Sequence, residues 1–429
     1  MEKQAFSEIT LSQILRKFFP KESVNNQQDT NTCNAVKMAL ERIENKPLFD
    51  EDSISSFSLK NNTVYQLNSL EAKIIERKII LNLKQVFNIQ TVSRAAIVQR
   101  LKLILAECVP YMVYRLDIKQ FFESFHSEVI EKTIYNDIRL SPQTRRLVKD
   151  LFGRYKSLKG SGCPRGLAIS SVITEILMQN FDAAIRNIPN CFFYARYVDD
   201  IIIITSKTED AKEFAGNIEK LLPMGLKFNK QKTEKVDHLG NKCKDNSSEN
   251  KSKPPKNKNK DKELEDNSFE YLGYKYIIDK ESTNNNKKII VDMADKKCSK
   301  YRFKIIRAFY DFYRNKDSKL LEDRIKFLTC NYKITKNYGS TEVLAGIYFN
   351  YPEISEEQVE QGNLKKLDKL LQAMLLSNKS RLTKLISPLL KQEIKNNLIK
   401  YSFVQSHKKK TFIKFDPKRL AEIKKCWEH

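Results

Sequence analysis

The alternation of apolar and polar positions predicts helices in the first part of the chain. Between residues 70 and 87, apolar residues recur at three- and four-residue steps, with basic residues between them. A second helix is predicted over residues 93–107, with Ser93 as its cap. Residues 6–107 are therefore expected to be mostly helical, interrupted by polar loops such as residues 25–32.

The pattern changes to short β-type runs in the centre of the chain. Residues 112–118 and 192–205 have this character, and a helical region that includes residues 168–185 separates them. A further strand is predicted over residues 271–278, then a basic amphipathic helix over residues 296–315, and further helices to the C-terminus. The predicted order is a helical first part, a centre that mixes helices and strands, and a helical last part. This order indicates the α+β class.

Residues 241–267 are rich in Lys, Asn and Ser and of low complexity. Such a segment buries too little apolar surface to offset its ordering entropy. We expect a disordered insertion there.

The charge of the chain favours a polyanionic partner. Seventy-seven Lys and Arg residues against 53 Asp and Glu residues give a net charge of +24. Nucleic acid is one such partner, because each neutralised phosphate releases counterions. Membrane surfaces and acidic proteins also attract basic chains, so charge alone leaves these classes open.

Cysteine and histidine usage gives no zinc or disulfide signature. The eight cysteines form no C-x-x-C pair, and the four histidines stand far apart. The N-terminus lacks an apolar signal core, and no apolar run approaches the roughly 18 residues of a membrane span. We expect a cytoplasmic protein with no membrane partner.

The strongest local feature is the sequence from Tyr197 to Asp200. Two apolar β-type runs flank the pair Asp199 and Asp200, which predicts a hairpin with both carboxylates at its turn. An ordinary turn explains the pair equally well, since Asp favours turns. Adjacent carboxylates between hydrophobic strands repel each other, however, and a divalent cation would compensate their charge.

Asp117 ends the other central strand and strengthens the metal hypothesis. If this strand lies beside the hairpin, Asp117 and Asp199 bracket two metal ions. Two such ions, about 3.5–4 Å apart, stabilise the attacking and leaving oxygens of a phosphoryl transfer. A salt bridge to Arg115 or Lys119 is the alternative role for Asp117.

The ordered motifs resemble those of reverse transcriptases. Asp117, Phe121 and Phe122 resemble motif A, residues 162–171 resemble motif B, and Tyr197–Asp200 resembles motif C. Residues 225–233 resemble motif D, residues 269–274 resemble the primer grip, and residues 76–80 resemble the fingers segment. The pattern is most similar to bacterial reverse transcriptases of the defence-associated, abortive-infection "unknown group".

The resemblance implies a role for each matching residue. The metal ligands are Asp117, Ile118, Asp199 and Asp200, for two Mg²⁺ ions with Mn²⁺ as a substitute, and Lys232 protonates the leaving pyrophosphate. Phe122 is the steric gate that excludes a 2′-hydroxyl, with Phe121 in the core. Nucleotide contacts are implied for Arg77, Lys78, Phe121, Phe122, Arg165 and Gly166, and template or primer contacts for Tyr197, Gly162, Tyr271, Leu272, Gly273 and Tyr274.

Two positions depart from the family pattern. Arg165 replaces the usual Gln of motif B, and Ser171 replaces the usual Pro. Arginine adds a fixed charge beside the implied nucleotide pocket, so an unusual template handling or nucleotide preference is expected.

The resemblance implies a right-hand polymerase of the α+β class. Residues 1–110 would form the helical N-terminal region and fingers, residues 111–278 an antiparallel palm, and residues 279–429 a helical thumb and C-terminal extension. The implied partners are a noncoding RNA template, a DNA product and deoxynucleoside triphosphates, with a homo-oligomer or a partner protein as a further expectation. An untemplated or protein-primed DNA polymerase, and a catalytically silent RNA-binding scaffold, remain the alternatives.

Overall fold

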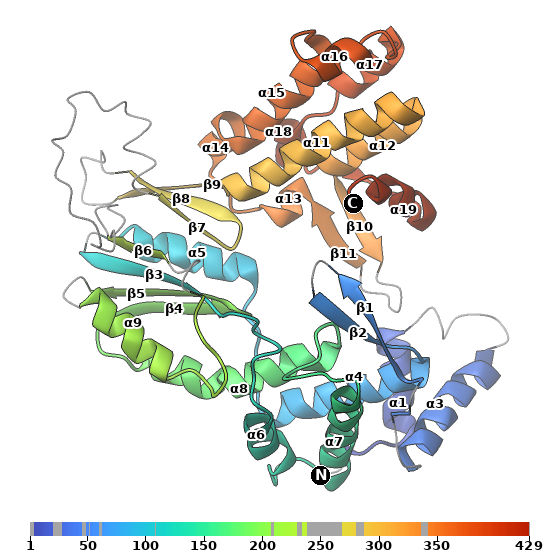
Figure 1. The fold of residues 1–429 in the computed structure, drawn as a ribbon, viewed down its shortest axis with the longest axis vertical. Helices are drawn as coiled ribbons and strands as arrows, with labels where there is room; N and C mark the ends of the chain where they lie inside the picture. The colour runs from blue at the N-terminus through green and yellow to red at the C-terminus, as the bar shows by residue number, and fades with distance from the viewer. Residues whose placement is uncertain are drawn as a thin grey trace. The chain divides into compact units, whose positions relative to one another are not determined.

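The computed structural model describes residues 4–19, 28–44, 49–50, 52–59, 62–107, 109–206, 210–229, 234–237, 268–279, 287–335 and 342–428. They divide into two compact units (Figure 1). The first unit holds the described residues up to Ser93 and those from Pro110 to Asp237. The second holds Arg94–Val109 and the described residues from Ser268 onward. The segment predicted to be disordered, residues 241–267, lies outside the described residues.

The first unit combines helices with two small sheets. Its elements are α1 (Glu8–Phe18), α3 (Gln28–Glu44), β1 (Ile54–Leu59), β2 (Asn62–Leu67), α4 (Leu70–Val86), β3 (Tyr111–Asp117), α6 (Ser127–Ile130), the π-helix η2 (Glu131–Tyr135), α7 (Pro142–Ser157), α8 (Ala168–Arg186), β4 (Cys191–Tyr197), β5 (Asp200–Ser206), α9 (Ala211–Lys220) and β6 (Glu234–Asp237). The helices predicted over residues 70–87 and 168–185 are confirmed as α4 and α8.

A four-stranded antiparallel sheet in the order β4-β5-β3-β6 organises the first unit. Ile201, Ile202, Ile203 and Ile204 of β5 are fully buried, as expected for a central strand with both faces covered. Helices α8 and α9 lie along one face of the sheet (Figure 1). Ile201 and Ile203 share their hydrophobic core with Ile173 and Phe181 of α8.

The expectation of a mostly helical first part missed the hairpin formed by β1 and β2. Its strands pair antiparallel from Ile54 opposite Leu67 to Leu59 opposite Asn62. Most side chains of β1 are exposed, including Phe57 and Leu59. A hairpin with so little burial gives only a weak period-two signal, so the sequence pattern did not reveal it.

The second unit is mainly helical and carries two three-stranded sheets. Its elements are α5 (Arg94–Leu105), β7 (Ser268–Tyr271), β8 (Tyr274–Asp279), β9 (Lys288–Met293), α11 (Asp295–Asn315), α12 (Ser318–Thr329), β10 (Asn331–Thr335), β11 (Glu342–Gly346), α13 (Ile347–Asn350), α14 (Glu356–Gln361), α15 (Asn363–Leu376), α16 (Arg381–Ile386), α17 (Gln392–Ile399), α18 (Phe403–Lys408), β12 (Phe412–Ile413) and α19 (Pro417–Lys425).

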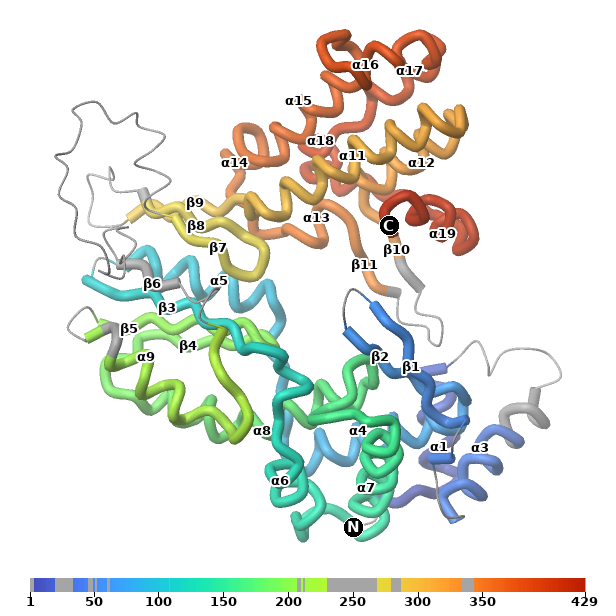
Figure 2. The backbone as a smooth tube through the Cα atoms, viewed as in Figure 1, coloured from blue at the N-terminus to red at the C-terminus, as the bar shows by residue number. Residues whose placement is uncertain are grey.

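Two expectations for the second unit were wrong in detail. The predicted strand over residues 271–278 is a hairpin of β7 and β8, because Leu272 and Gly273 both adopt positive φ and reverse the chain. The C-terminal third, expected to be helical, contains the sheet β11-β10-β12, of which Figure 2 labels β10 and β11, and β12 pairs parallel with β10. This pairing joins residues about 80 positions apart, which a local pattern does not encode.

The C-terminal helix α19 and the residues after it are bonded to α11 and α12. The indole Nε1 of Trp427 donates to the carbonyl of Lys304 at 3.0 Å. Arg307 Nε donates to the carbonyl of Cys426 at 3.2 Å, and Arg324 Nε to that of Ile423 at 3.3 Å. These hydrogen bonds attach α19 and Trp427 to the helices α11 and α12 of the second unit. Within the described part of the chain, no helix is both long and apolar enough to cross a membrane.

Candidate active site

The predicted hairpin of β4 and β5 is present, but only one of its two carboxylates lies at the turn, because Asp200 is the first residue of β5. Tyr197 pairs with Asp200, which leaves Val198 and Asp199 as the two turn residues. Val198 has φ +62°, while Asp199 is not among the described residues with positive φ. This is the pattern of a type II′ turn, which normally has glycine at its first central position. A β-branched residue with positive φ is a genuine outlier.

Strand β3 lies beside this hairpin, which is the arrangement that the two-metal hypothesis requires. Asp117 is the register partner of Asp200, and the N–H of Ile118 donates to the carbonyl of Asp199 at 3.2 Å. Asp117 is buried, and Asn229 donates from its side-chain amide to Asp117 Oδ2 at 3.4 Å. The sheet thus places all three aspartates at one end of adjacent strands.

These carboxylates are the right donors for a hard divalent cation, which prefers oxygen ligands. Over the described ranges, however, no group of three or more His, Cys, Asp or Glu side chains is gathered closely enough to hold a metal ion. The backbone of Asp117, Asp199 and Asp200 fits a shared site by position.

The motif B loop is tied to the neighbouring segments by main-chain bonds. Cys163 N–H donates to the carbonyl of Phe122 at 2.7 Å, and Tyr65 N–H donates to that of Arg165 at 2.7 Å. A Cβ on Gly162 would lie 2.4 Å from the Phe122 carbonyl oxygen. A Cβ on Gly166 would lie 2.4 Å from the Tyr65 carbonyl oxygen. Both glycines, at φ +66° and +103°, therefore admit close protein backbone.

Arg165 forms a fork with Glu123, a residue that the sequence reasoning missed. Its Nε and Nη2 lie 2.6 and 3.0 Å from the two Glu123 carboxylate oxygens. The guanidinium carbon is 5.3 Å from the ring centroid of Phe122. The hydrogen bonds to Glu123 raise the pKa of Arg165, and the charge of Asp199 adds to this effect. The only signal for Glu123 was an acidic residue next to the implied gate.

Phe121 and Phe122 differ in how far they are buried. Phe121 is buried with 2% of its surface exposed, and Phe122 is only partly buried and packs edge-on against it. Phe122 is thus the ring of the pair that retains an open side.

The fingers segment packs against the N-terminal region. The Arg77 guanidinium lies 5.0 Å from the Phe18 ring centroid. Lys78 is buried near the ring of Phe6, and burial lowers its pKa. These contacts give no support to nucleotide binding by Arg77 and Lys78. The neighbouring Glu76 is buried, which raises its pKa, and it accepts the N–H of Ile169 at 2.9 Å as a cap for α8.

The predicted primer-grip residues belong to the second unit. The rings of Tyr271 and Tyr274 are buried, with 0% and 1% of their surface exposed. Arg94 lies 4.9 Å from the ring centroid of Tyr274. Leu272 and Gly273 form the turn between them, with φ of +49° and +78°. Primer contact through the two tyrosine rings is therefore not supported. Lys232 of motif D lies outside the described residues.

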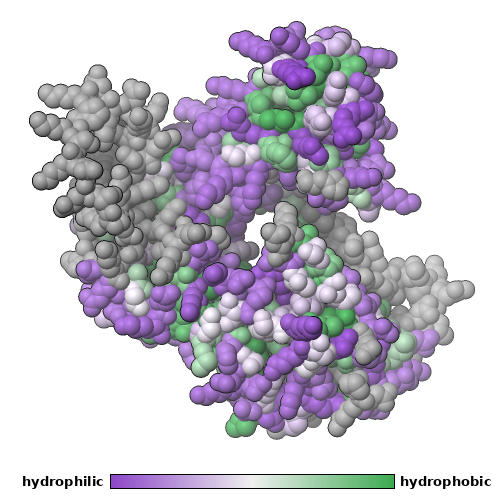
Figure 3. Space-filling model, viewed as in Figure 1, coloured by the Kyte–Doolittle hydropathy of each residue, from purple (hydrophilic) through white to green (hydrophobic). Residues whose placement is uncertain are grey.

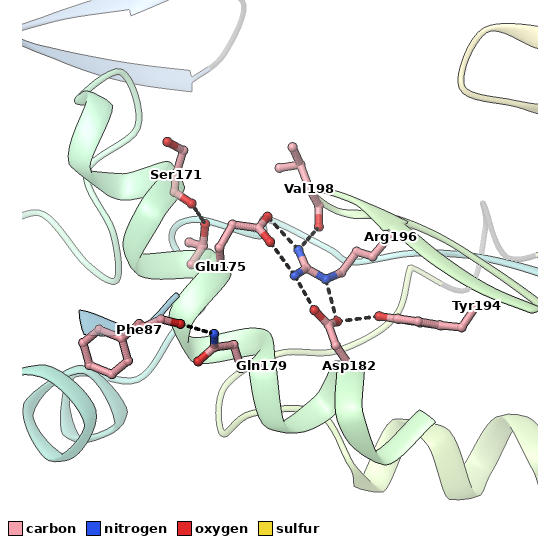
Figure 4. A network of polar contacts seen from close by, with 9 residues as sticks. Phe87, Ser171, Glu175, Gln179, Asp182, Tyr194, Arg196 and Val198 are labelled. Atoms are coloured by element: carbon pink, nitrogen blue, oxygen red, sulfur yellow. Dashed lines mark hydrogen bonds and ion pairs between the residues drawn. The ribbon is translucent and has the colours of Figure 1, made fainter. Parts of the chain in front are cut away.

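Arg196, which the sequence reasoning also missed, connects the turn to α8 (Figure 4). Its guanidinium contacts Glu175 at 3.0 and 2.8 Å and Asp182 at 2.8 Å through both Nε and Nη2. Nη1 also donates to the carbonyl of Val198 at 3.2 Å. Burial opposes the charge of Arg196, but the bonds to Asp182 and Glu175 outweigh it and raise its pKa. Tyr194 completes the network by donating to Asp182 at 2.5 Å.

A cavity of about 480 Å³ lies beside the turn that follows Asp117. Its lining includes Phe125, His126, Tyr135, Phe152 and Lys156. None of the three aspartates lines it, so the cavity is separate from the carboxylate site.

Comparison with known families decides the class of protein. Residues 60–276 match the family model described as "Reverse transcriptase (RNA-dependent DNA polymerase)". The chain belongs to this reverse transcriptase family. The family is described as RNA-dependent DNA polymerases, and its members generally use divalent metal ions.

Solved structures similar to this reverse transcriptase include two telomerases. One is telomerase from Candida albicans in complex with a TWJ fragment of telomeric RNA, at 14% identity and a TM-score of 0.32. It covers 87% of this chain. The other is apo telomerase from Candida tropicalis, at 13% identity and a TM-score of 0.35, covering 94% of this chain. This chain spans 61% of each telomerase chain. A search of curated proteins finds no significant match.

Proposed function

We propose that this reverse transcriptase copies a dedicated noncoding RNA into DNA by two-metal catalysis, in bacterial antiphage defence. The observation that carries the catalytic part is the register of the sheet. It pairs Asp117 with Asp200 and places Asp199 at the adjoining turn. The motif resemblance to defence-associated enzymes supports the biological part.

In the proposed reaction, the 3′-hydroxyl of a primer attacks the α-phosphorus of a deoxynucleoside triphosphate and pyrophosphate leaves. Asp117 and Asp199 would hold the metal ions, with Asp200 in support and the Ile118 main chain alongside. When bound, the ions would stabilise charge on the attacking and leaving oxygens. The contribution of the chain is positioning, because strand pairing fixes Asp117 and Asp200 and holds both ends of the turn that carries Asp199.

Phe122 would select the sugar. Its ring is the partly open member of the pair with Phe121, and the Glu123–Arg165 fork lies against it. A ring held in this way would leave no room for a 2′-hydroxyl, which distinguishes ribonucleotides from deoxynucleotides.

Helix α11 is the proposed contact with the nucleic-acid duplex. Exposed Phe303 and Tyr310 alternate along it with exposed basic residues, namely Lys296, Lys300, Arg302 and Arg314. Basic and aromatic side chains together suit binding to phosphates and bases. The face seen in Figure 3 is mostly hydrophilic over both units. In the proposed division, residues 1–110 act as fingers, 111–278 as palm and 279–429 as thumb and extension.

Incorporation of labelled deoxynucleotides on an RNA template tests the enzymatic proposal. Wild-type protein should extend a primer, and Asp199→Ala should not. Phe122→Ala should extend the primer and accept ribonucleotides more readily. Unchanged sugar selection in Phe122→Ala would contradict the gate, and synthesis by Asp199→Ala would contradict the site.

Sequencing of nucleic acid that co-purifies with the protein tests the template. A discrete RNA and its complementary DNA are expected. DNA covalently attached to the protein, seen as a nuclease-sensitive mass shift, would favour the protein-primed alternative. Lack of any discrete RNA, with synthesis that survives RNase, would exclude the dedicated template.

A further inference from the structure

We propose that Arg196 is a positioning residue that keeps the turn at Val198 and Asp199 in the shape that presents the Asp199 carboxylate. The inference rests on the proposed function, because it concerns the metal site to which Asp199 is assigned. It adds Arg196, Glu175 and Asp182 to the residues on which that site depends.

The turn needs an outside support because its own sequence does not favour its shape. Val198 adopts φ +62°, a region that L-residues with a branched Cβ avoid for steric reasons. Glycine or asparagine would adopt this conformation at little cost. A turn of this kind is maintained only where its surroundings determine it.

Arg196 provides this support through the carbonyl of Val198. That carbonyl belongs to the peptide group joining Val198 to Asp199, so a donor on its oxygen fixes the orientation of this peptide plane. Nη1 of Arg196 is that donor, at 3.2 Å. If this peptide group rotated, ψ of Val198 and φ of Asp199 would change together, and the direction of the Asp199 side chain would change with them. The hydrogen bond thus acts directly on the residue that would hold the metal.

The guanidinium itself is held firmly. Only 3% of the Arg196 side chain is exposed, and both of its carboxylate partners lie on α8. Glu175 and Asp182 are seven residues apart, two helical turns, and face the hairpin together (Figure 4). Arginine is suited to this role because its planar fork contacts two carboxylates and still has a donor for the carbonyl.

Helix α8 is in turn a fixed reference. Its N-terminus is capped by Glu76 of α4, and Ile173, Ile176, Phe181 and Ile185 are buried in the core. The position of the Asp199 turn therefore depends on α8, a helix that is anchored in the core of the first unit.

The test measures metal binding without turnover. Mn²⁺ binding to the full-length protein, bound to a dideoxy-terminated primer on an RNA template, is followed by electron paramagnetic resonance. Arg196→Lys keeps the charge but loses the fork, and its apparent Mn²⁺ dissociation constant should rise on the order of tenfold. Glu175→Gln removes the charge of one of the two anchors and one of its two acceptor oxygens, and should produce a smaller rise in the same direction.

Two further variants separate positioning from general stability. Arg419→Lys is the matched control, because Arg419 also bridges two carboxylates, Asp323 and Glu422, in the second unit. It should lower the melting temperature without changing Mn²⁺ binding. Val198→Gly in the Arg196→Lys background should recover most of the lost binding, since glycine adopts the turn unaided.

The outcomes are distinct. The proposed metal site fails if wild-type protein binds no Mn²⁺, or if Asp199→Asn binds Mn²⁺ as well as wild type does. If wild type binds but Arg196→Lys and Glu175→Gln bind equally well, the inference about Arg196 fails alone. If Val198→Gly restores nothing, or if Arg419→Lys weakens Mn²⁺ binding as much as Arg196→Lys does, Arg196 is structural and the inference is overturned.

Discussion

Among the hairpins whose turn the structure describes, two have a two-residue turn, and they stabilise that turn in opposite ways. In the first unit, Val198 and Asp199 connect β4 to β5, and Val198 adopts a strained positive φ. In the second unit, Leu272 and Gly273 connect β7 to β8 between two buried tyrosines. Glycine makes the second turn favourable by itself at one of its positions, whereas the first relies on Arg196 from outside.

The difference follows from what each turn carries. The first turn holds Asp199 beside Asp117 and Asp200, and its shape depends on a buried guanidinium and two carboxylates of α8. The second turn holds no carboxylate and is covered by Arg94, which lies over Tyr274 and Tyr351. A turn that is bonded to a rigid helix places its side chain within narrow limits, which suits a catalytic carboxylate.

Removal of the first turn's carboxylate should have the largest effect. Asp199→Asn keeps the size of the side chain but loses its charge, and we expect primer extension to fall on the order of a thousandfold. Asp200 is the proposed supporting carboxylate, so primer extension should fall less in Asp200→Asn. Single-nucleotide incorporation rates measure both. Equal losses in the two variants would contradict the division of roles between them.

Asp292, which lies on β9 opposite Lys275 of β8, should make the stability of the second unit depend on pH. Asp292 of β9 is buried and accepts the main-chain N–H groups of Met293 and Asn363, and burial raises its pKa to about 6. Proton binding therefore favours the folded state. This stabilisation is complete below the ordinary value near 3.8 and is lost as the pH rises through 6.

Chemical unfolding monitored by Trp427, the single tryptophan of the chain, reports on the second unit. Between pH 4 and pH 7 its unfolding free energy should lose about 1–3 kcal/mol through this group. Asp292→Asn should flatten that dependence, whatever its effect on absolute stability. An unchanged slope would show that Asp292 does not carry the effect.

Replacement of the glycine in the second turn should destabilise its hairpin. Gly273→Ala places a Cβ at φ +78°, and the nearest atom, Lys297 Cε at 3.2 Å, is on a flexible side chain. The cost is then conformational, about 1–2 kcal/mol in the Trp427 transition. Gly216→Ala is the control, because that helical glycine has nothing within 4 Å of an added Cβ and lies in the first unit. It should leave the Trp427 transition in place.

Loss of the arginine over the second turn should have the smallest effect. Arg94→Gln removes the cation from Tyr274 and Tyr351, for which we expect about 0.5–1 kcal/mol of destabilisation in the same Trp427 transition. Mn²⁺ binding should be unaffected, in contrast to Arg196→Lys. A rise in the Mn²⁺ dissociation constant of Arg94→Gln would contradict the claim that only the first turn affects metal binding.

The aspartate arrangement could be predicted because its determinants are local. The strand ending at Asp117 and the hairpin at Asp199 each show in the apolar pattern, and antiparallel pairing then brings their ends together. The family motifs fix their order along the chain. The same reasoning separated buried Phe121 from partly open Phe122.

The supporting residues could not be predicted because their partners are distant in sequence. Glu123 lies 42 residues from Arg165, and Arg196 lies 21 and 14 residues from Glu175 and Asp182. These pairings appear only when helix and sheet have packed. The positive φ of Val198 could not be predicted either, since a valine favours a strand and disfavours a positive φ.

The contacts of α19, Trp427 and β12 with the rest of the second unit have a consequence for folding during synthesis of the chain. Helix α19 and Trp427 bond to α11 and α12, and β12 pairs with β10. The described strands of the carboxylate-bearing sheet, by contrast, are all translated by Asp237. At roughly 5–20 residues per second, a ribosome needs about 10–40 s to reach Trp427 from there. Nascent chains stalled within α15 should therefore show a protease-resistant first unit and a second unit that is still open to cleavage.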